Sequence, residues 1–208
     1  MNIPSEILSF WLLVDEPIGT AIGVLVVLCL IRQNLWAWPL GVIYILASVS
    51  VLLEGRLFAN LLLHLVAFLP MNLYGWYYWI YGKQNDQNRL VVSWSDWKSL
   101  WVLILICLII GTVLGSYFSS NTDAAHPYLD SSVFVLSVGA IWLTARKKID
   151  NWFVWFVVNV ISIYLYFSQG LIFYGWLYIV YLGMAVGGFI EWRKAMYQAI
   201  VIDTRKES

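Results

Sequence analysis

The feature that most constrains the fold is a series of long apolar segments that follow one another along most of the chain. We read seven of them, at 17–33, 36–54, 57–82, 98–118, 129–146, 150–168 and 171–193. About 20 mostly apolar residues are enough for a helix to cross the hydrocarbon core of a membrane. The sequence therefore predicts an all-α membrane protein with seven transmembrane helices.

Composition excludes several other classes of protein. Of the 208 residues, 62% are hydrophobic and only 12% are charged, against about 25% charged residues in a typical soluble domain. These values exclude a disordered chain, a nucleic-acid-binding protein and an ordinary soluble enzyme. The 13 Trp and 13 Tyr residues exceed what aromatic belts at the two membrane interfaces need. We therefore expect some of these rings to line a binding site.

The distribution of Lys and Arg predicts the orientation of the helices. Loops on the cytoplasmic side of a membrane protein carry an excess of both residues. With seven helices and an N-terminus outside, every Lys and Arg except Arg56 falls on the inner side. We therefore expect the N-terminus outside and the C-terminus in the cytoplasm.

The two halves of the chain resemble each other at a shift of about 115 residues. At this shift Arg32 meets Lys147, and Phe58 meets Phe173. Each half holds three predicted helices, and an odd helix at 98–118 lies between them. An odd connecting helix gives both halves the same orientation, which is one of the duplication schemes of secondary transporters, with the substrate site where the repeats meet. We predict a 3+1+3 parallel repeat.

This organisation divides the chain into five parts. They are an N-terminal segment at 1–16, a first three-helix repeat at 17–82, a loop and connecting fourth helix at 83–128, a second three-helix repeat at 129–193 and a cytoplasmic tail at 194–208. The apolar stretch near 5–13 is too short to span a membrane. We expect it to lie at the membrane interface.

Polar side chains inside the third apolar segment predict one wall of a cavity. Such groups are costly in a membrane, so they face a cavity or another helix. Asn60 and His64 are four residues apart and share a helix face, and Tyr78 falls near the same face. Asn72 is a further polar candidate in this segment.

The sixth and seventh segments each carry a stripe of aromatic and polar residues at helical spacing. The stripes are Trp155, Asn159, Ser162 and Tyr166 in the sixth, and Tyr174, Tyr178, Tyr181 and Ala185 in the seventh. An amide beside stacked rings suits a neutral, planar ligand that forms hydrogen bonds. The alternative is that these residues join helices to each other, as Asn, Ser and Tyr often do in membranes.

The apolar segments lack the acidic groups and motifs of ion-coupled or nucleotide-driven transporters, which favours passive transport. No carboxylate lies in the middle of an apolar segment, where ion-coupled carriers usually keep such groups. Those closest to the segments lie near their ends, namely Glu54, Asp123, Asp130, Asp150 and Glu191. The sequence has no nucleotide-binding loop and no HExxH motif. We expect no catalytic residue, metal or cofactor. An integral membrane enzyme using His64 with Asp123 or Asp130 is an alternative of another class, and a sensor or assembly subunit is a third.

Four motifs together resemble the PnuC family of bacterial vitamin transporters over about residues 20–193. They are RQNLWAWPLG at 32–41, YGWYYW at 74–79, TDAAHPYLDS at 122–131 and ARKKIDNWFVWFVVNVISIYLYFSQG at 145–170. The resemblance implies a seven-helix fold similar to that of SWEET sugar transporters, in the bacterial inner membrane, and a homotrimer surrounded by membrane lipid. It also implies facilitated diffusion of nicotinamide riboside, which a cytoplasmic kinase would trap inside the cell by phosphorylation.

The resemblance and the stripes together predict eight ligand-binding residues. They are Asn60, His64, Tyr78, Trp142, Trp155, Asn159, Tyr166 and Tyr178. The two asparagines would bind the carboxamide or the ribose hydroxyls, and the aromatic faces would attract the cationic pyridinium. The resemblance leaves thiamine, which also carries a cationic ring, and then riboflavin as alternative vitamins, because members of the family carry them.

Overall fold

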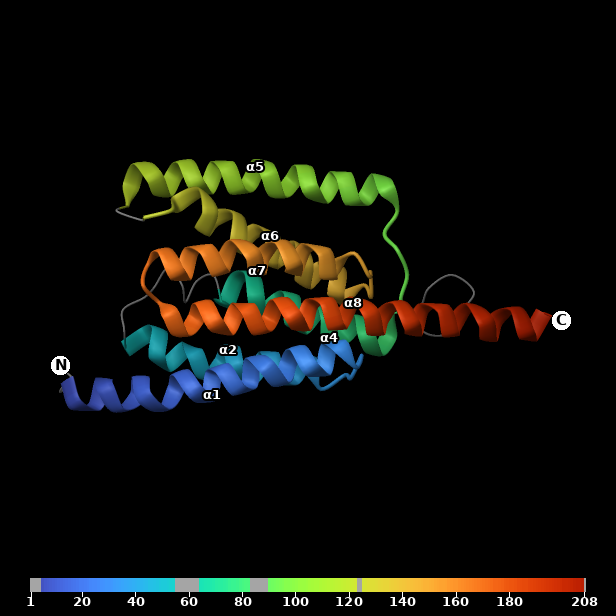
Figure 1. Ribbon diagram of the computed structural model, residues 1–208, viewed down its shortest axis with the longest axis horizontal. Coiled ribbons are helices and arrows are strands. Elements are labelled where there is room, and N and C mark those ends of the chain that lie inside the picture. Colours follow the sequence, from blue (N-terminus) through green and yellow to red (C-terminus); the bar gives the residue numbers. More distant parts are fainter. Residues whose placement is uncertain (1–4, 55–63, 83–89, 123–124, 208) are drawn as a thin grey trace.

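The protein is built from long, roughly parallel and antiparallel helices (Figure 1). The computed structural model describes residues 5–54, 64–82, 90–122 and 125–207, with the side chains of 5–17, 47–48, 50–54, 200 and 202–207 left out. In chain order the elements are α1 (Ser5–Ile31), α2 (Ala37–Glu54), the π-helical turn η1 (His64–Phe68), α4 (Leu69–Tyr81), α5 (Trp97–Asn121), α6 (Pro127–Ala145), α7 (Asn151–Ser168) and α8 (Ile172–Glu207). The prediction of an all-helical chain is therefore confirmed.

Four stretches of the described helices are long and apolar enough to cross a membrane. They are Trp97–Asn121, Pro127–Ala145, Asn151–Ser168 and Ile172–Ala199, and shorter apolar stretches lie at Ile18–Ile31 and Ala37–Leu46. Two helices are longer than the sequence predicted. Residues 5–16 belong to α1, and residues 194–207 continue α8, whose C-terminal end extends past the other helices in Figure 1.

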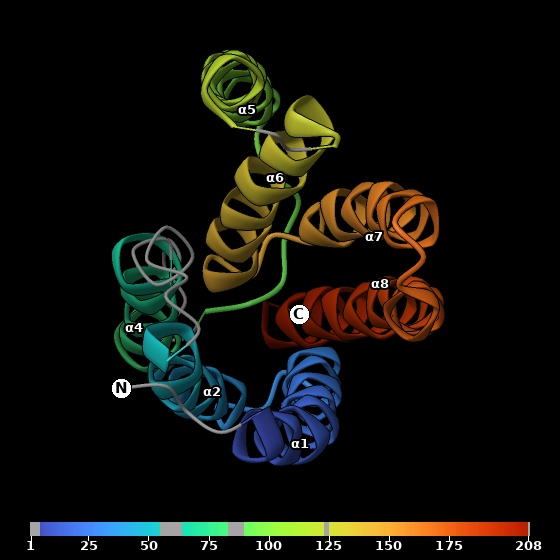
Figure 2. The same ribbon diagram turned by 90° about the vertical axis from the view of Figure 1, so that its left-hand side faces the viewer.

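Six of the helices form a closed ring. Around it, α1 packs on α2, α2 on α4, α4 on α6, α6 on α7, α7 on α8 and α8 on α1. Figure 2 shows this ring along its axis, with α5 outside it and packed against α6. The ring therefore has two junctions between the N-terminal and C-terminal halves of the chain, namely α4 with α6 and α8 with α1.

The first helix of each half ends in the same turn. Gln33 after α1 and Lys147 after α6 have φ angles of 52° and 50°. The carbonyl of Leu30 accepts a hydrogen bond from Gln33 N, and the carbonyl of Thr144 accepts one from Lys147 N, both at 3.0 Å. Gln33 and Lys147 are equivalent residues, as are Leu30 and Thr144. The members of each pair are one residue closer in the sequence than the shift of about 115 residues.

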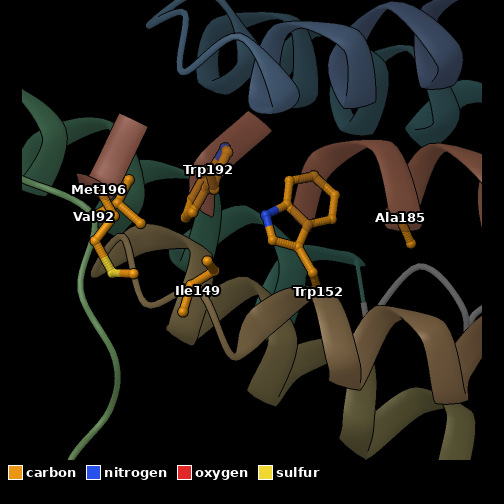
Figure 3. Packing of buried hydrophobic residues seen from close by; sticks show 6 residues of the cluster. All are labelled: Val92, Ile149, Trp152, Ala185, Trp192 and Met196. Carbon is orange, nitrogen blue, oxygen red and sulfur yellow. The ribbon is translucent and has the colours of Figure 1, made fainter. Parts of the chain in front are cut away.

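The second and third helices of each half also pack alike. The ring of Trp38 on α2 occupies the place where a Cβ on Gly75 of α4 would lie, and Trp152 on α7 does the same at Gly188 of α8. Trp152 belongs to the main buried apolar cluster, which Figure 3 shows. Its members are Val92, Ile149, Trp152, Ala185, Trp192 and Met196.

The segment at 90–96 crosses the end of the bundle where that cluster lies. Ser93 N donates to the Lys147 carbonyl at 3.2 Å, and Ile149 N donates to the Ser93 carbonyl at 2.9 Å. Ser95 N donates to Oδ2 of Asp150 at 2.6 Å. Where α5 begins, Asp96 accepts a hydrogen bond from Ser99 N at 2.9 Å, and this bond lowers the pKa of the Asp96 carboxyl.

Candidate functional site

A cavity of about 380 Å³ lies inside the ring of six helices. Its wall includes residues from α1, α2, η1, α4, α6, α7 and α8, and none from α5. The described wall is made of Gly23, Val26, Val27, Leu30, Ala37, Trp38, Gly41, Tyr44, Ile45, His64, Phe68, Asn72, Ser137, Ile141, Thr144, Trp152, Trp155, Val158, Asn159, Tyr178, Tyr181 and Ala185. Both halves of the chain therefore contribute to one cavity.

The α7 wall presents an indole and an amide one helical turn apart. Trp155 and Asn159 both line the cavity, and Asn159 is only 5% exposed. The indole nitrogen of Trp155 donates to Oγ1 of Thr144 at 3.5 Å, which is a long bond. Among the described residues the Asn159 amide has no hydrogen-bond partner, so its donors and acceptor remain available to a ligand.

The part of the cavity wall formed by α8 carries tyrosines whose rings pack against other tyrosine rings. The ring of Tyr178 stacks on that of Tyr166 with centroids 5.0 Å apart and an interplanar angle of 29°. Tyr174 stacks on the same Tyr166 at 5.4 Å, and Tyr181 meets Tyr178 edge to face at 5.6 Å. Tyr178 and Tyr181 line the cavity, whereas Tyr166 lies behind Tyr178 and supports it.

The opposite wall carries a second amide. The side-chain nitrogen of Asn72 donates to the Phe68 carbonyl at 2.9 Å. Its oxygen lies where a Cβ on Gly41 of α2 would be, so the absence of a side chain at Gly41 makes room for it. The ring of His64 meets that of Phe68 edge to face at 5.5 Å.

The described wall of the cavity contains no Asp, Glu, Lys or Arg side chain. In the turn after α6, outside the described wall, the guanidinium of Arg146 lies 4.7 Å from the ring centroid of Trp142 and 5.6 Å from that of Tyr78. Polar but uncharged walls suit a ligand that is neutral or carries a delocalised positive charge.

Four of the eight predicted site residues lie on the cavity wall. These are His64, Trp155, Asn159 and Tyr178. Tyr166 supports the wall from behind, Trp142 and Tyr78 lie on Arg146 outside the described wall, and Asn60 falls outside the described residues. Ligand contact by any of them stays a prediction.

A π-helical turn explains why Asn72 was left out of the predicted site and Tyr78 was included. The α-helical period from His64 runs through residues 68, 71, 75 and 78. The π-helical turn at His64–Phe68 adds a residue to one turn of the helix. Beyond this turn Asn72 rather than residue 71 lines the cavity with Phe68, and Trp79, the residue after Tyr78, bonds to the Thr144 carbonyl.

A neutral cavity enclosed by two three-helix units of one chain is the arrangement of a membrane carrier. The model of the nicotinamide mononucleotide transporter family matches residues 14–194. Since this match covers most of the chain, the protein belongs to that family, as the motifs of the PnuC family indicated, and it is a multi-pass membrane transporter rather than an enzyme.

Curated relatives carry two different vitamins. The nicotinamide riboside transporter PnuC of Escherichia coli is 26% identical over 201 residues, which cover 85% of this chain and 84% of the relative. The riboflavin/roseoflavin transporter RibM of Streptomyces davaonensis is 23% identical over 183 residues, which cover 86% of this chain and 84% of the relative.

A solved structure has the same fold. The crystal structure of the vitamin B3 transporter PnuC superposes with a TM-score of 0.65 at 21% sequence identity, over 86% of this chain and 80% of that one.

Proposed function

We propose that this protein carries nicotinamide riboside across the bacterial inner membrane by facilitated diffusion. The observation that carries the proposal is the cavity of about 380 Å³ with Trp155, Asn159 and Tyr178 on its wall. Its size falls within the roughly 300–1,000 Å³ of small-molecule sites. Rings and amides on a neutral wall offer stacking and hydrogen bonds without a fixed counter-charge.

The ligand would be held by its two chemically different ends. The Asn159 amide offers a donor and an acceptor to a carboxamide or to ribose hydroxyls. The faces of Trp155 and Tyr178 attract a cationic pyridinium. The Asn72 amide on the opposite wall is placed to bind the other end.

We further propose a seven-helix 3+1+3 parallel repeat of the SWEET type, with the N-terminus outside and the C-terminus in the cytoplasm. The equivalent turns at Gln33 and Lys147, the equivalent packing of Trp38 and Trp152, and the position of α5 outside the ring support the repeat. The excess of Lys and Arg on one side supports the orientation.

Trapping and assembly complete the proposal. Because the described wall offers no carboxylate to bind a coupling ion, net uptake would depend on a cytoplasmic kinase that phosphorylates the vitamin.

We also propose a homotrimer. The apolar side chains of α5 that face away from α6, such as Leu108 and Val113, are 63% exposed and are available to lipid or to another copy.

Riboflavin is the second candidate substrate, because RibM is among the similar relatives. Thiamine is the third, on the chemistry of its cationic ring. Calorimetric titration of the purified protein with nicotinamide riboside, riboflavin and thiamine decides between them. We expect saturable binding of nicotinamide riboside. Trp155→Phe should weaken this binding more than Trp176→Phe does, since Trp176 is 62% exposed and outside the described wall. Tighter binding of riboflavin or thiamine would contradict the proposal.

A further inference from the structure

Four tryptophans form a continuous layer across the ring of helices. Trp38 meets Trp79 at 5.4 Å between centroids and 82°, Trp79 meets Trp192 at 6.3 Å, and Trp192 meets Trp152 at 5.5 Å and 90°. We call these four residues the tryptophan layer. Each half of the chain contributes one indole from its second helix and one from its third.

Two of these indoles form hydrogen bonds between the halves. The indole nitrogen of Trp79 on α4 donates to the Thr144 carbonyl on α6 at 3.2 Å. The indole nitrogen of Trp192 on α8 donates to the Leu30 carbonyl on α1 at 2.9 Å. One bond therefore spans each of the two junctions between the halves, and the two bonds are equivalent in the repeat.

The other two indoles, of Trp38 and Trp152, pack edge to face with Trp79 and Trp192. Figure 3 shows the nitrogen of Trp152 on the edge of its ring that points toward Trp192. Neither Trp152 Nε1 nor Trp38 Nε1 has a hydrogen-bond partner within the described part of the chain. Edge-to-face contacts between rings are favourable, and the two T-shaped pairs stabilise the layer within each half.

The tryptophan layer closes one end of the cavity. Trp38 and Trp152 line the cavity, while Val92, Ile149 and Met196 pack with Trp152 and Trp192 in the buried cluster. Trp192 is fully buried at 0% exposure, and Trp38 and Trp152 are each 3% exposed. These burials mean that the three rings are packed against protein at the end of the cavity lined by Trp38 and Trp152.

We propose that Trp79 and Trp192 are paired latches of a gate at this end of the cavity, and that their indole N–H groups hold the gate shut. The proposal rests on the transport function proposed above. A vitamin can leave at this end only if the halves separate at the layer, and both cross-half hydrogen bonds must then break. These residues act on the closed-to-open equilibrium and not on ligand contact.

The conservative substitutions are Trp79→Phe and Trp192→Phe, which keep an aromatic ring in the layer and remove only the indole portion that carries the donor. The Leu30 and Thr144 carbonyls keep their bonds from Gln33 N and Lys147 N, so neither is left without a partner. From the usual net contribution of one hydrogen bond, each variant should raise the population of the open state roughly three- to tenfold.

The test measures thiol labelling in the cavity, which requires no ligand. Ser137, on the cavity wall, is changed to cysteine in a background of Cys29→Ala and Cys107→Ala. A membrane-impermeant thiol reagent is then applied to vesicles from either face. We expect Trp79→Phe and Trp192→Phe each to accelerate labelling roughly three- to tenfold from the face that carries the C-terminal end of α8, and the double variant to exceed both. Labelling from the other face should stay unchanged.

Trp176→Phe is the matched control, because Trp176 is on the same helix as Trp192 but exposed. Unchanged labelling in folded, monodisperse latch variants would overturn the proposal. Equal acceleration from both faces, or the same acceleration in Trp176→Phe, would show general loosening and also overturn it. Failure of nicotinamide riboside to bind would contradict the proposed substrate and leave the labelling result valid, so the two failures are distinguishable.

Discussion

Gly188 of α8 lies so close to the indole of Trp152 that a methyl group on Gly188 would overlap the ring. Gly75 of α4 has the same relationship to Trp38. In both halves the third helix thus presents a glycine to the second helix, and a tryptophan one turn further on enters the tryptophan layer. The close approach of these helices, and so the position of the layer, depends on a missing side chain.

Gly188→Ala is expected to destabilise the protein. The added methyl must displace the buried Trp152 ring, and such overpacking typically costs about 1–3 kcal/mol. Thermal unfolding in detergent should show a lower Tm. Gly187→Ala is the control, because a Cβ at Gly187 meets nothing within 4 Å. Alanine lowers the conformational entropy of the unfolded chain, so Tm should stay equal or rise slightly. Equal effects of the two substitutions would contradict the steric argument.

Asn159→Leu is expected to weaken ligand binding. Leu has nearly the same volume, but a ligand group that pairs with the Asn159 amide would lose its partner, at a cost of about 1–3 kcal/mol or roughly tenfold to a hundredfold in affinity. If Asn159 only joins helices, the cost should instead appear as about 0.6 kcal/mol of stability. Ligand titration and thermal unfolding without ligand separate these outcomes.

Val160→Leu is the matched control for Asn159→Leu. Val160 is the next residue on α7 and is 44% exposed on the outside of the helix. This change should alter neither affinity nor Tm. An unchanged affinity in Asn159→Leu together with a lower Tm would remove Asn159 from the site.

The phosphorylated ligand is expected to be rejected. A phosphate carries about −1.5 to −2 charges at neutral pH, and the described cavity wall offers no Lys or Arg to receive them. Competition of nicotinamide mononucleotide against labelled nicotinamide riboside should show affinity lower by at least an order of magnitude. Equal competition would mean that a basic group such as Arg146 reaches the cavity after all.

Uptake is expected to need no ion gradient. The described wall of the cavity carries no Asp or Glu side chain that could bind a coupling ion. Proteoliposomes should therefore equilibrate nicotinamide riboside at the same rate and to the same level with and without a proton or sodium gradient. Accumulation above equilibrium under either gradient would contradict this expectation.

Local pattern was enough to predict the helices and part of the cavity. Apolar length predicted α5, α6, α7 and the membrane part of α8, since a span of that length has few alternatives in a membrane. The spacing of Trp155 and Asn159 placed both on one face of α7, and the structure puts that face on the cavity. Such features follow from helix geometry along one continuous segment.

Features that depend on contacts between distant segments needed the tertiary structure. A π-helical turn lies at His64–Phe68, and beyond it Trp79 bonds to the Thr144 carbonyl and packs on Trp192, while Tyr78 contacts Arg146. The bond from Trp192 to the Leu30 carbonyl joins residues from opposite ends of the chain. No periodicity within α8 indicates that partner, because the packing of helices around the ring determines which backbone carbonyl an indole meets. The sequence thus determined which segments become helices and which side chains share a face, whereas tertiary packing decided which residues of the two halves form hydrogen bonds with each other.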